Sequence, residues 1–169
     1  MLAPQIMPVA YINGTADDCR APITLRLIDY WRARMPEGNG LPRLQDFELM
    51  DLYDIATSLA IKDAVDDGRD FKNRFWGSDL TIAFGFEGSG RLVSSYELSN
   101  MRYAVSRRYA YVYTTGTSSM ARGHISWIPG KEYLAFELVH LPLWGTGDSI
   151  QHIISAYHFG FELPENASL

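Results

Sequence analysis

The chain has 169 residues, 47% of them hydrophobic and 21% charged, a composition typical of one folded globular domain and not of a disordered segment. The net charge of −5 and the absence of a long basic run argue against direct nucleic-acid binding. No run approaches the ~20 apolar residues needed to cross a bilayer, and the first residues do not resemble a secretion signal. We therefore expect a cytoplasmic protein. The single cysteine, Cys19, excludes an internal disulfide and a multi-cysteine metal site.

The N-terminal part of the chain is expected to hold an irregular arm and one helix. Prolines interrupt residues 1–22, which we take as the arm. Thr24 is a plausible N-cap for a helix that runs to about Met35, where Pro36 follows. We assign residues 23–40 to this flanking helix and a linker.

One side of the expected helix is apolar. It carries Leu27, Ile28, Trp31 and Met35 at helical spacing. Two interpretations stay open. The stripe packs on the chain's own sheet, or it forms a dimer or partner face.

A short helix and a hairpin are expected next. Asp46 to Leu52 has the pattern of the helix, and Thr57 to Asp63 pairs with Asp70 to Trp76 around the turn Asp66-Asp67-Gly68. Period-2 spacing would place Phe71, Asn73 and Phe75 on one face of the second strand.

Two helices are predicted after this hairpin. Ser78 or Asp79 can cap a short helix over Leu80 to Phe84, with Gly85 as a left-handed stop. Asn100 to Tyr113 should contain a longer helix, although its Tyr-Ala-Tyr-Val-Tyr end also fits a strand.

The last third of the chain alternates with period two. Thr114 to Ile128, Glu132 to Trp144 and Ser149 to Phe161 are predicted to be three long antiparallel strands. Five strands with helices inserted after the second predict an α+β fold with one antiparallel sheet. This unit spans residues 41–163, and residues 164–169 form a tail.

Asn73 is the clearest candidate for a binding residue. An amide buried between two phenylalanines needs a hydrogen-bond partner, because leaving it unsatisfied costs on the order of 1–3 kcal/mol. The partner is a backbone group or water, or else a polar atom of a ligand. The walls of such a ligand pocket would come from the following residues, although the inward face of the last strands is left open: Phe75, Phe84, Phe86, Tyr103, Met120, Phe136, Leu138, His140 and Tyr157.

Metal and enzyme chemistry receive less support. The histidines gather in the last third of the chain, but the ligand spacing of a zinc site is absent, so we expect no metal. Glu137 lies on the strand face opposite Phe136 and Leu138, and we expect it to be exposed to solvent. A small curved-sheet isomerase or dehydratase that uses Glu137, His124 or His140 is the alternative to a protein without catalytic residues.

Several motifs, in this order, resemble a PAS domain, and more narrowly a group of bacterial single-PAS-domain proteins. They are Tyr30-Trp31, Leu41-Pro42-Arg43, Asp46-Phe47, Phe-x-x-Arg-Phe-x-Gly-Ser at Phe71 to Ser78, Phe-Gly-Phe-Glu-x-x-Gly-Arg at Phe84 to Arg91, and His140-Leu141-Pro142-Leu143 followed by Gly145 and Asp148. The resemblance implies a five-stranded antiparallel sheet with short helices on one face and an N-terminal flanking helix.

The resemblance also implies a sensory or interaction role. No output domain accompanies the sheet in these residues, so we expect a stand-alone signalling module. Its expected partners are signalling proteins such as histidine kinases, a second copy in a homodimer, and a small apolar or aromatic ligand. Its cofactor is unknown: covalent flavin is disfavoured because Cys19 precedes the sheet, and haem because Asn100 to Tyr113 holds no histidine.

Overall fold

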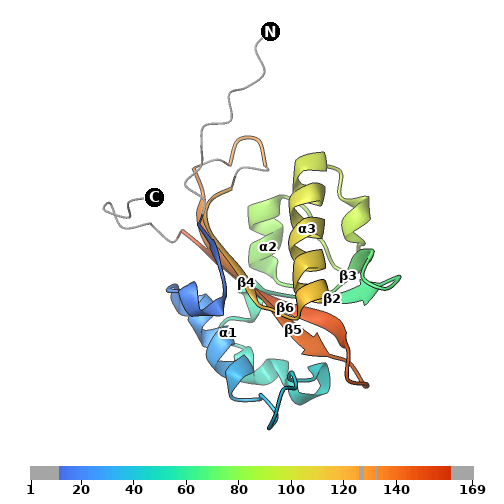
Figure 1. Ribbon diagram of the computed structural model, residues 1–169. Helices are drawn as coiled ribbons and strands as arrows, with labels where there is room; N and C mark the ends of the chain where they lie inside the picture. Colours follow the sequence, from blue (N-terminus) through green and yellow to red (C-terminus); the bar gives the residue numbers. More distant parts are fainter. Residues whose placement is uncertain (1–11, 126–127, 132, 161–169) are drawn as a thin grey trace.

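A six-stranded antiparallel sheet lies between two layers of helices in the computed structural model (Figure 1), which describes residues 12–125, 128–131 and 133–160. Residues 1–11 of the expected arm and residues 164–169 of the expected tail lie outside the described residues. So do residues 126–127, 132 and 161, which belong to the expected strands. The strands, in the spatial order β1-β4-β5-β6-β2-β3, are β1 (Ile12–Gly14), β4 (Ser119–His124), β5 (Ala135–Trp144), β6 (Ile150–Phe159), β2 (Leu59–Val65) and β3 (Asp70–Trp76).

The predicted α+β class is confirmed, but the number of strands is not five. The described part of the arm, which we expected to be irregular, adds β1 to the edge of the sheet by pairing Ile12–Gly14 with β4. A strand of three residues has too little sequence pattern to be predicted, and β4 provides the partner that defines it. A short 3₁₀ helix follows at Ala16–Asp18.

The first hairpin has the predicted turn, but its second strand contains an irregularity. Asp66, Asp67 and Gly68 all have positive φ. In the pairing of β2 with β3, Ile61 is opposite Phe75 while Lys62 is opposite Asn73, so Arg74 is an extra residue in β3. Such a bulge reverses the alternation of side chains beyond it. Phe71 and Asn73 therefore face one layer of helices, and Phe75 packs with the core on the opposite face.

The first face of the sheet is covered by α2 (Ser78–Phe84), a 3₁₀ helix (Val93–Ser95) and α3 (Ser99–Thr115). Gly85 ends α2 in a left-handed conformation, as predicted, although the residue before the helix is Gly77 and neither Ser78 nor Asp79 is its N-cap. The Tyr-Ala-Tyr-Val-Tyr segment lies entirely within α3. The helix ends before Gly116, which also has positive φ. Tyr109 and Val112 pack on the sheet and explain this outcome, because their burial requires helical spacing.

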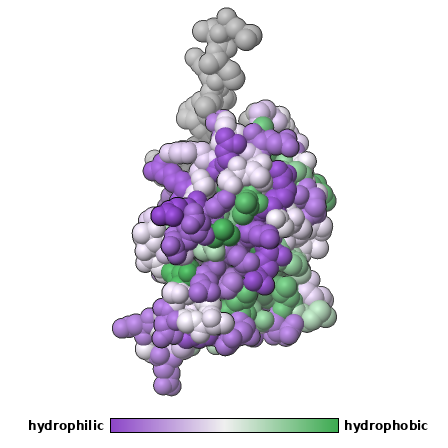
Figure 2. Space-filling view, turned by 90° about the vertical axis from the view of Figure 1, so that its right-hand side faces the viewer, coloured by the Kyte–Doolittle hydropathy of each residue, from purple (hydrophilic) through white to green (hydrophobic). Residues whose placement is uncertain are grey.

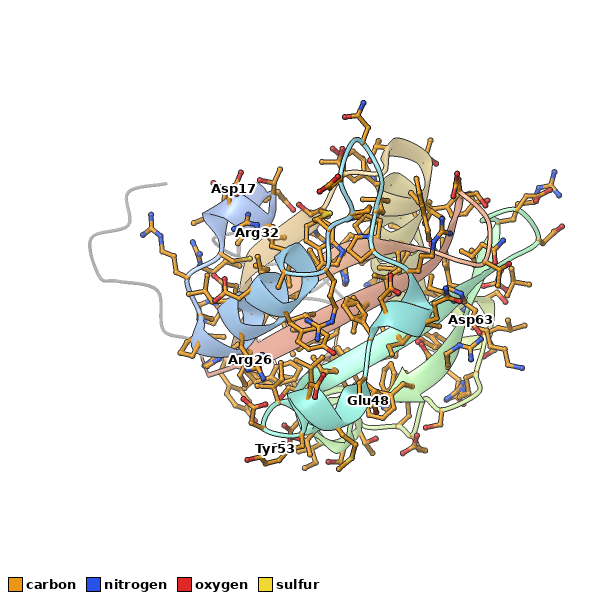
Figure 3. All side chains as sticks on the ribbon, turned by 90° about the horizontal axis from the view of Figure 1, so that it is seen from below. Asp17, Arg26, Arg32, Glu48, Tyr53 and Asp63 are labelled. Atoms are coloured by element: carbon orange, nitrogen blue, oxygen red, sulfur yellow. The ribbon has the colours of Figure 1, made fainter. Side chains whose placement is uncertain are left out.

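The opposite face is covered by α1 (Pro22–Arg32) and by 3₁₀ helices at Leu44–Asp46, Leu49–Leu52 and Ala56–Ser58. Helix α1 begins at Pro22, whose missing N–H suits the first turn, so Thr24 is inside the helix and is not its N-cap. The predicted helix over Asp46 to Leu52 is instead two 3₁₀ turns. Figure 3 shows α1 and the segment with Glu48 and Tyr53 on the same side of the sheet.

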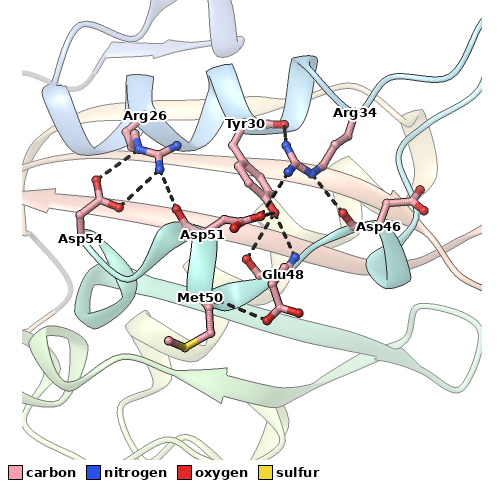
Figure 4. A network of polar contacts seen from close by, with 8 residues as sticks. All are labelled: Arg26, Tyr30, Arg34, Asp46, Glu48, Met50, Asp51 and Asp54. Atoms are coloured by element: carbon pink, nitrogen blue, oxygen red, sulfur yellow. Dashed lines mark hydrogen bonds and ion pairs between the residues drawn. The ribbon is translucent and has the colours of Figure 1, made fainter.

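Polar contacts fasten this segment to α1 (Figure 4). Arg26 donates to Asp54 and to the Asp51 carbonyl, and Arg34 donates to the Asp46 carbonyl while its guanidinium lies 3.3 Å from the Tyr30 ring centroid. The Tyr30 hydroxyl lies 3.0 Å from an Asp51 carboxylate oxygen. These groups are partly exposed, so each ion pair contributes little stability, and their main effect is to fix the path of the chain.

The apolar stripe of α1 lies against the sheet. Leu27, Ile28 and Trp31 are buried in the core shared with β5 and β6, and the Trp31 indole donates to the Pro142 carbonyl at 3.0 Å. In this structure they are covered by the chain's own sheet, so they do not present the partner face that was one of the two interpretations. Met35, which lies beyond the helix, is 39% exposed.

Two further observations concern the outside of the protein. No helix within the described ranges is both long enough and apolar enough to span a membrane. On the face seen in Figure 2, hydrophobic residues form separate patches among hydrophilic ones.

A buried charge pair joins α1, the segment before it and the sheet. Glu137 on β5 is completely buried and accepts from Arg122 on β4, from the Thr24 hydroxyl and from the backbone amides of Arg20 and Ala21. The expectation that Glu137 faces solvent is therefore wrong, because α1 and the preceding segment cover this part of the sheet. Burial raises the pKa of the Glu137 carboxyl, but these hydrogen bonds outweigh that effect and the pKa is lowered overall.

We predict that Glu137→Gln will destabilise the fold by about 3 kcal/mol, because it leaves the Arg122 charge buried without its counterion. Urea denaturation followed by circular dichroism would measure this. The exposed Glu37→Gln provides the control and should change stability by less than about 0.5 kcal/mol. Equal stability of both variants would show that the buried pair does not hold α1 to the sheet.

Candidate functional site

A lysine is buried beneath α3. Lys62 on β2 is 1% exposed, and its Nζ lies 3.2 Å from the Tyr109 hydroxyl. The same Nζ is 4.4 Å from the Tyr109 ring centroid and 5.5 Å from that of Trp76. It occurs in no ion pair among the described residues. Aromatic faces stabilise a cation only partly, so the charge of this ammonium group is poorly compensated.

Four neutral side chains continue from Lys62 into a buried polar cluster. The Tyr109 hydroxyl lies 2.6 Å from Ser155 Oγ and 3.5 Å from the Tyr157 hydroxyl. Ser155 Oγ in turn lies 2.6 Å from His140 Nδ1. We call Lys62, Tyr109, His140, Ser155 and Tyr157 the inner cluster.

Neighbouring strands and one helix assemble the inner cluster. His140 on β5 is the register partner of Ser155 on β6, and β2 places Lys62 beside Ile153 of the same strand. Tyr109 reaches down from α3. The groups come from four separate segments of the chain, so their proximity depends on the sheet register and on the docking of α3.

The electrostatics of the inner cluster favour its uncharged forms. Burial lowers the pKa of the Lys62 ammonium to about 7. Burial also lowers the pKa of His140 well below its ordinary value, and the positive charges of Arg108 and Lys62 add to this effect. Burial raises the pKa of Tyr109 well above its ordinary value, an effect that Tyr157 reinforces. None of the five side chains of the inner cluster is a carboxylate, and its amine and hydroxyl groups can donate hydrogen bonds.

One small cavity adjoins the inner cluster, and a second shares Phe84 with the first. The first, of about 20 Å³, is lined in part by Tyr109, His140, Tyr157 and Phe84, and it has room for about one water molecule. The second, of about 140 Å³, is bounded by Phe84, Phe86, Arg91 and Met101 among others. The Phe84 ring lines both cavities, so it stands between the inner cluster and the space under the start of α3.

Asn73 is buried, as predicted, and part of its amide has a protein partner. Its Nδ2 donates to the Gly88 carbonyl at 2.9 Å and to the Tyr96 hydroxyl at 2.8 Å. Its Oδ1 has no hydrogen-bond partner within the part of the chain that the structure describes. The donor side of the amide thus has the backbone partner that one interpretation required, and the acceptor side does not.

Most of the predicted pocket residues lie together on the face covered by α2 and α3. This group consists of Asn73, Phe84, Phe86, Phe136, Leu138, His140 and Tyr157.

Three predicted pocket residues lie elsewhere. Phe75 faces the α1 side because of the bulge at Arg74, and Met120 is buried on that side too, opposite Val139. Tyr103 is 65% exposed on the outer surface of α3. The alternation of β4 and the helical phase of α3 were both ambiguous in the sequence, and the packing decides them.

Sequence reasoning missed Lys62 and Tyr109 as members of the site. A lysine within the apolar run Leu59 to Ile61 is a weak signal, because most lysines in strands reach solvent. Tyr109 lay in the segment whose structure was left open between helix and strand. The face of a residue in such a segment follows only once its secondary structure is known.

Several other reactive side chains lie outside the inner cluster. Cys19 is buried on the α1 side, where burial raises its pKa to about 12. His152 Nδ1 lies 2.7 Å from Asp63, and His158 accepts from the Ile23 amide. Within the described ranges, no three histidine, cysteine or acidic side chains group as metal ligands would.

No protein-family model, curated protein or solved structure matches this chain.

We predict that the stability of the protein will rise with pH between about 7 and about 9.5, by on the order of 3 kcal/mol. With a pKa of about 7 when folded and 10.5 when unfolded, Lys62 binds a proton in the unfolded chain but not in the native protein over this interval. Lys62→Met should abolish the increase, and the exposed Lys72→Met should retain it. Urea titrations at several pH values measure the effect. A wild-type protein with the same free energy of unfolding throughout would contradict the burial of an unpaired ammonium.

Proposed function

We propose that this protein is a PAS-like cytoplasmic sensory module, without catalytic residues, that binds a small ligand at the inner cluster and signals to partner proteins. The observation that carries the proposal is the buried Lys62 amine, which lies among hydroxyl and aromatic groups and donates to Tyr109, a residue that lines a cavity. Buried charges in proteins are normally paired, so a bound group that completes this site would stabilise it.

The order of the elements supports the PAS-like part of the proposal. A hairpin (β2 and β3) is followed by helices on one face and then by three antiparallel strands, β4 to β6. This is the arrangement that the resemblance implies, with α1 in the place of the expected flanking helix and β1 added to the sheet. The inner cluster lies between the strands and those helices, where a ligand would contact both layers.

The donors of the inner cluster define the class of ligand. A molecule with an acceptor or anionic group, such as a small carboxylate, would pair with Lys62 and accept from the Tyr109 or Tyr157 hydroxyl. Its apolar part would lie against Phe84 and Leu138, which line the same cavity. The cavities of about 20 and 140 Å³ favour a molecule of a few heavy atoms, which modifies the purely apolar or aromatic ligand expected from the sequence.

Displacement of Phe84 gives such a ligand a way to act on partners. Phe84 is the last residue of α2 and contacts Tyr157 and Phe159 edge-on at 5.7 and 6.1 Å. A ligand that joined the two cavities would have to move this ring and with it the end of α2. The expected partners are signalling proteins such as histidine kinases and a second copy of the chain, both inferred from the resemblance, and the ligand would shift the population of binding-competent conformations.

Native mass spectrometry tests the ligand directly. Wild-type protein should have a native mass greater than its denatured mass by the mass of a small molecule. Lys62→Met should lose this difference while it keeps a cooperative thermal transition, and Lys72→Met should retain it, because Lys72 is exposed on β3. Identical native and denatured masses for the wild type, together with no stabilisation by formate, acetate or pyruvate, would contradict the proposal and favour a pure interaction module.

A second candidate, a small enzyme, is favoured by one observation: the inner cluster combines ionisable groups beside a cavity. Lys62, with a pKa of about 7, could act as a general base, whereas Glu137 is already paired with Arg122 on the other face of the sheet. The recovered small molecule separates the two functions. A sensor returns its ligand unchanged after incubation, and an enzyme returns a product.

A further inference from the structure

A second site is suggested by a surface groove of about 680 Å³ between α3 and the N-terminal strand β1. Its volume is within the range of small-molecule sites, and it lies outside the layer that holds the inner cluster. One wall is α3, with Tyr103, Arg107, Arg108 and Tyr111. The other is made of Asn13, Gly14 and Thr15, with Ser119 at the start of β4.

The groove is positively charged in a chain whose net charge is −5. Arg107 and Arg108 line it, and none of its lining residues is acidic. Arg108 is oriented across the groove, since its Nη2 donates to Asn13 Oδ1 at 2.8 Å. Guanidinium groups match the geometry of phosphate oxygens, so charge complementarity favours an anionic occupant.

Aromatic side chains flank the arginines. One stripe along α3 carries Tyr103, Arg107 and Tyr111, because these residues are spaced four apart. Neighbours in the stripe are separated by about 6 Å along the helix. Arg107 Nη1 lies 3.3 Å from the Tyr103 hydroxyl, which places the cation beside this ring. Tyr103 and Tyr111 are 65% and 51% exposed, so both rings are accessible at the surface.

We propose that the groove binds a small phosphate ester that carries a planar ring, a ligand of the nucleotide class. Arg107 and Arg108 would hold the phosphate, and Tyr103 or Tyr111 would stack on the ring. The distance of one helical turn between arginine and tyrosine is comparable to the length of the ribose that joins the ring to the phosphate in a nucleotide. Thr15, Asn13 and Ser119 on the opposite wall offer polar groups to the sugar.

Arg108 connects this groove with the interior. It lines the groove and also the cavity of about 20 Å³ beside His140. A phosphate bound to Arg108 would therefore change the charge at the wall of the cavity beside the inner cluster. The proposal itself is independent of the interior ligand, because the groove residues and the inner cluster share no member.

Isothermal titration calorimetry with ADP as the probe tests the groove, with adenosine and pyrophosphate as the two halves of the ligand. We expect ADP to bind at least about tenfold more tightly than either half, as stacking and charge pairing combine. Arg107→Gln and Tyr103→Ala should each weaken ADP by at least about tenfold. Arg69→Gln and Tyr53→Ala remove the same groups from exposed positions elsewhere and should change affinity by less than about twofold.

Three results would overturn the proposal: no ADP binding at millimolar concentration, equal losses in the control variants, or pyrophosphate binding as tight as that of ADP. Lys62→Met keeps this test separate from the proposed function. It should still bind ADP, and Arg107→Gln and Tyr103→Ala should still weaken that binding, whether or not the interior holds a ligand.

Discussion

The sheet is covered on both faces, and each polar side chain that is buried there therefore needs a partner. The two faces meet this constraint in opposite ways. On the α1 face, Glu137 receives hydrogen bonds from Arg122, Thr24 and two backbone amides, so a buried charge is fully compensated. On the α3 face, Lys62 meets only neutral hydroxyl and aromatic groups. The polar groups of the first face therefore hold α1 to the sheet. On the second face, a ligand with an anionic group would give Lys62 the ion-pair partner that it lacks among the described residues.

This asymmetry agrees with the local architecture of the two layers. Helix α1 and the segment 44–58 are tied together by several polar contacts and by a continuous apolar core (Figure 4). Over the other face, α2 has only seven residues and its last residue, Phe84, divides two cavities. Short helices contribute little stability of their own, so their position depends on what lies beneath them. In the proposed sensor, the layer of α2 would be the one that responds to a ligand beneath it.

The groove beside β1 adds an external feature to the same layer. Helix α3 presents Tyr109 to the interior and Tyr103, Arg107 and Tyr111 to the surface. Arg108 lies at the boundary and lines both spaces. One helix therefore carries both proposed sites on different faces, and a change in its position would alter the two together. Such coupling requires only that each ligand prefer one position of α3.

Local sequence determined the features that depend on neighbouring residues: the turn at Asp66 to Gly68, the stop of α2 at Gly85, and the hairpin and strands of an α+β sheet. The burial of Asn73 was also predicted, although only Phe71 of its two apolar neighbours at period two shares its face of the sheet. Tertiary structure alone decided which face each residue occupies. The extra residue Arg74 turned Phe75 away from the predicted pocket, β4 placed Met120 on the α1 side, and the covering layers buried Glu137 and Lys62. These outcomes depend on register and on packing between segments far apart in the chain, whereas a local pattern records only the spacing of a residue from its neighbours.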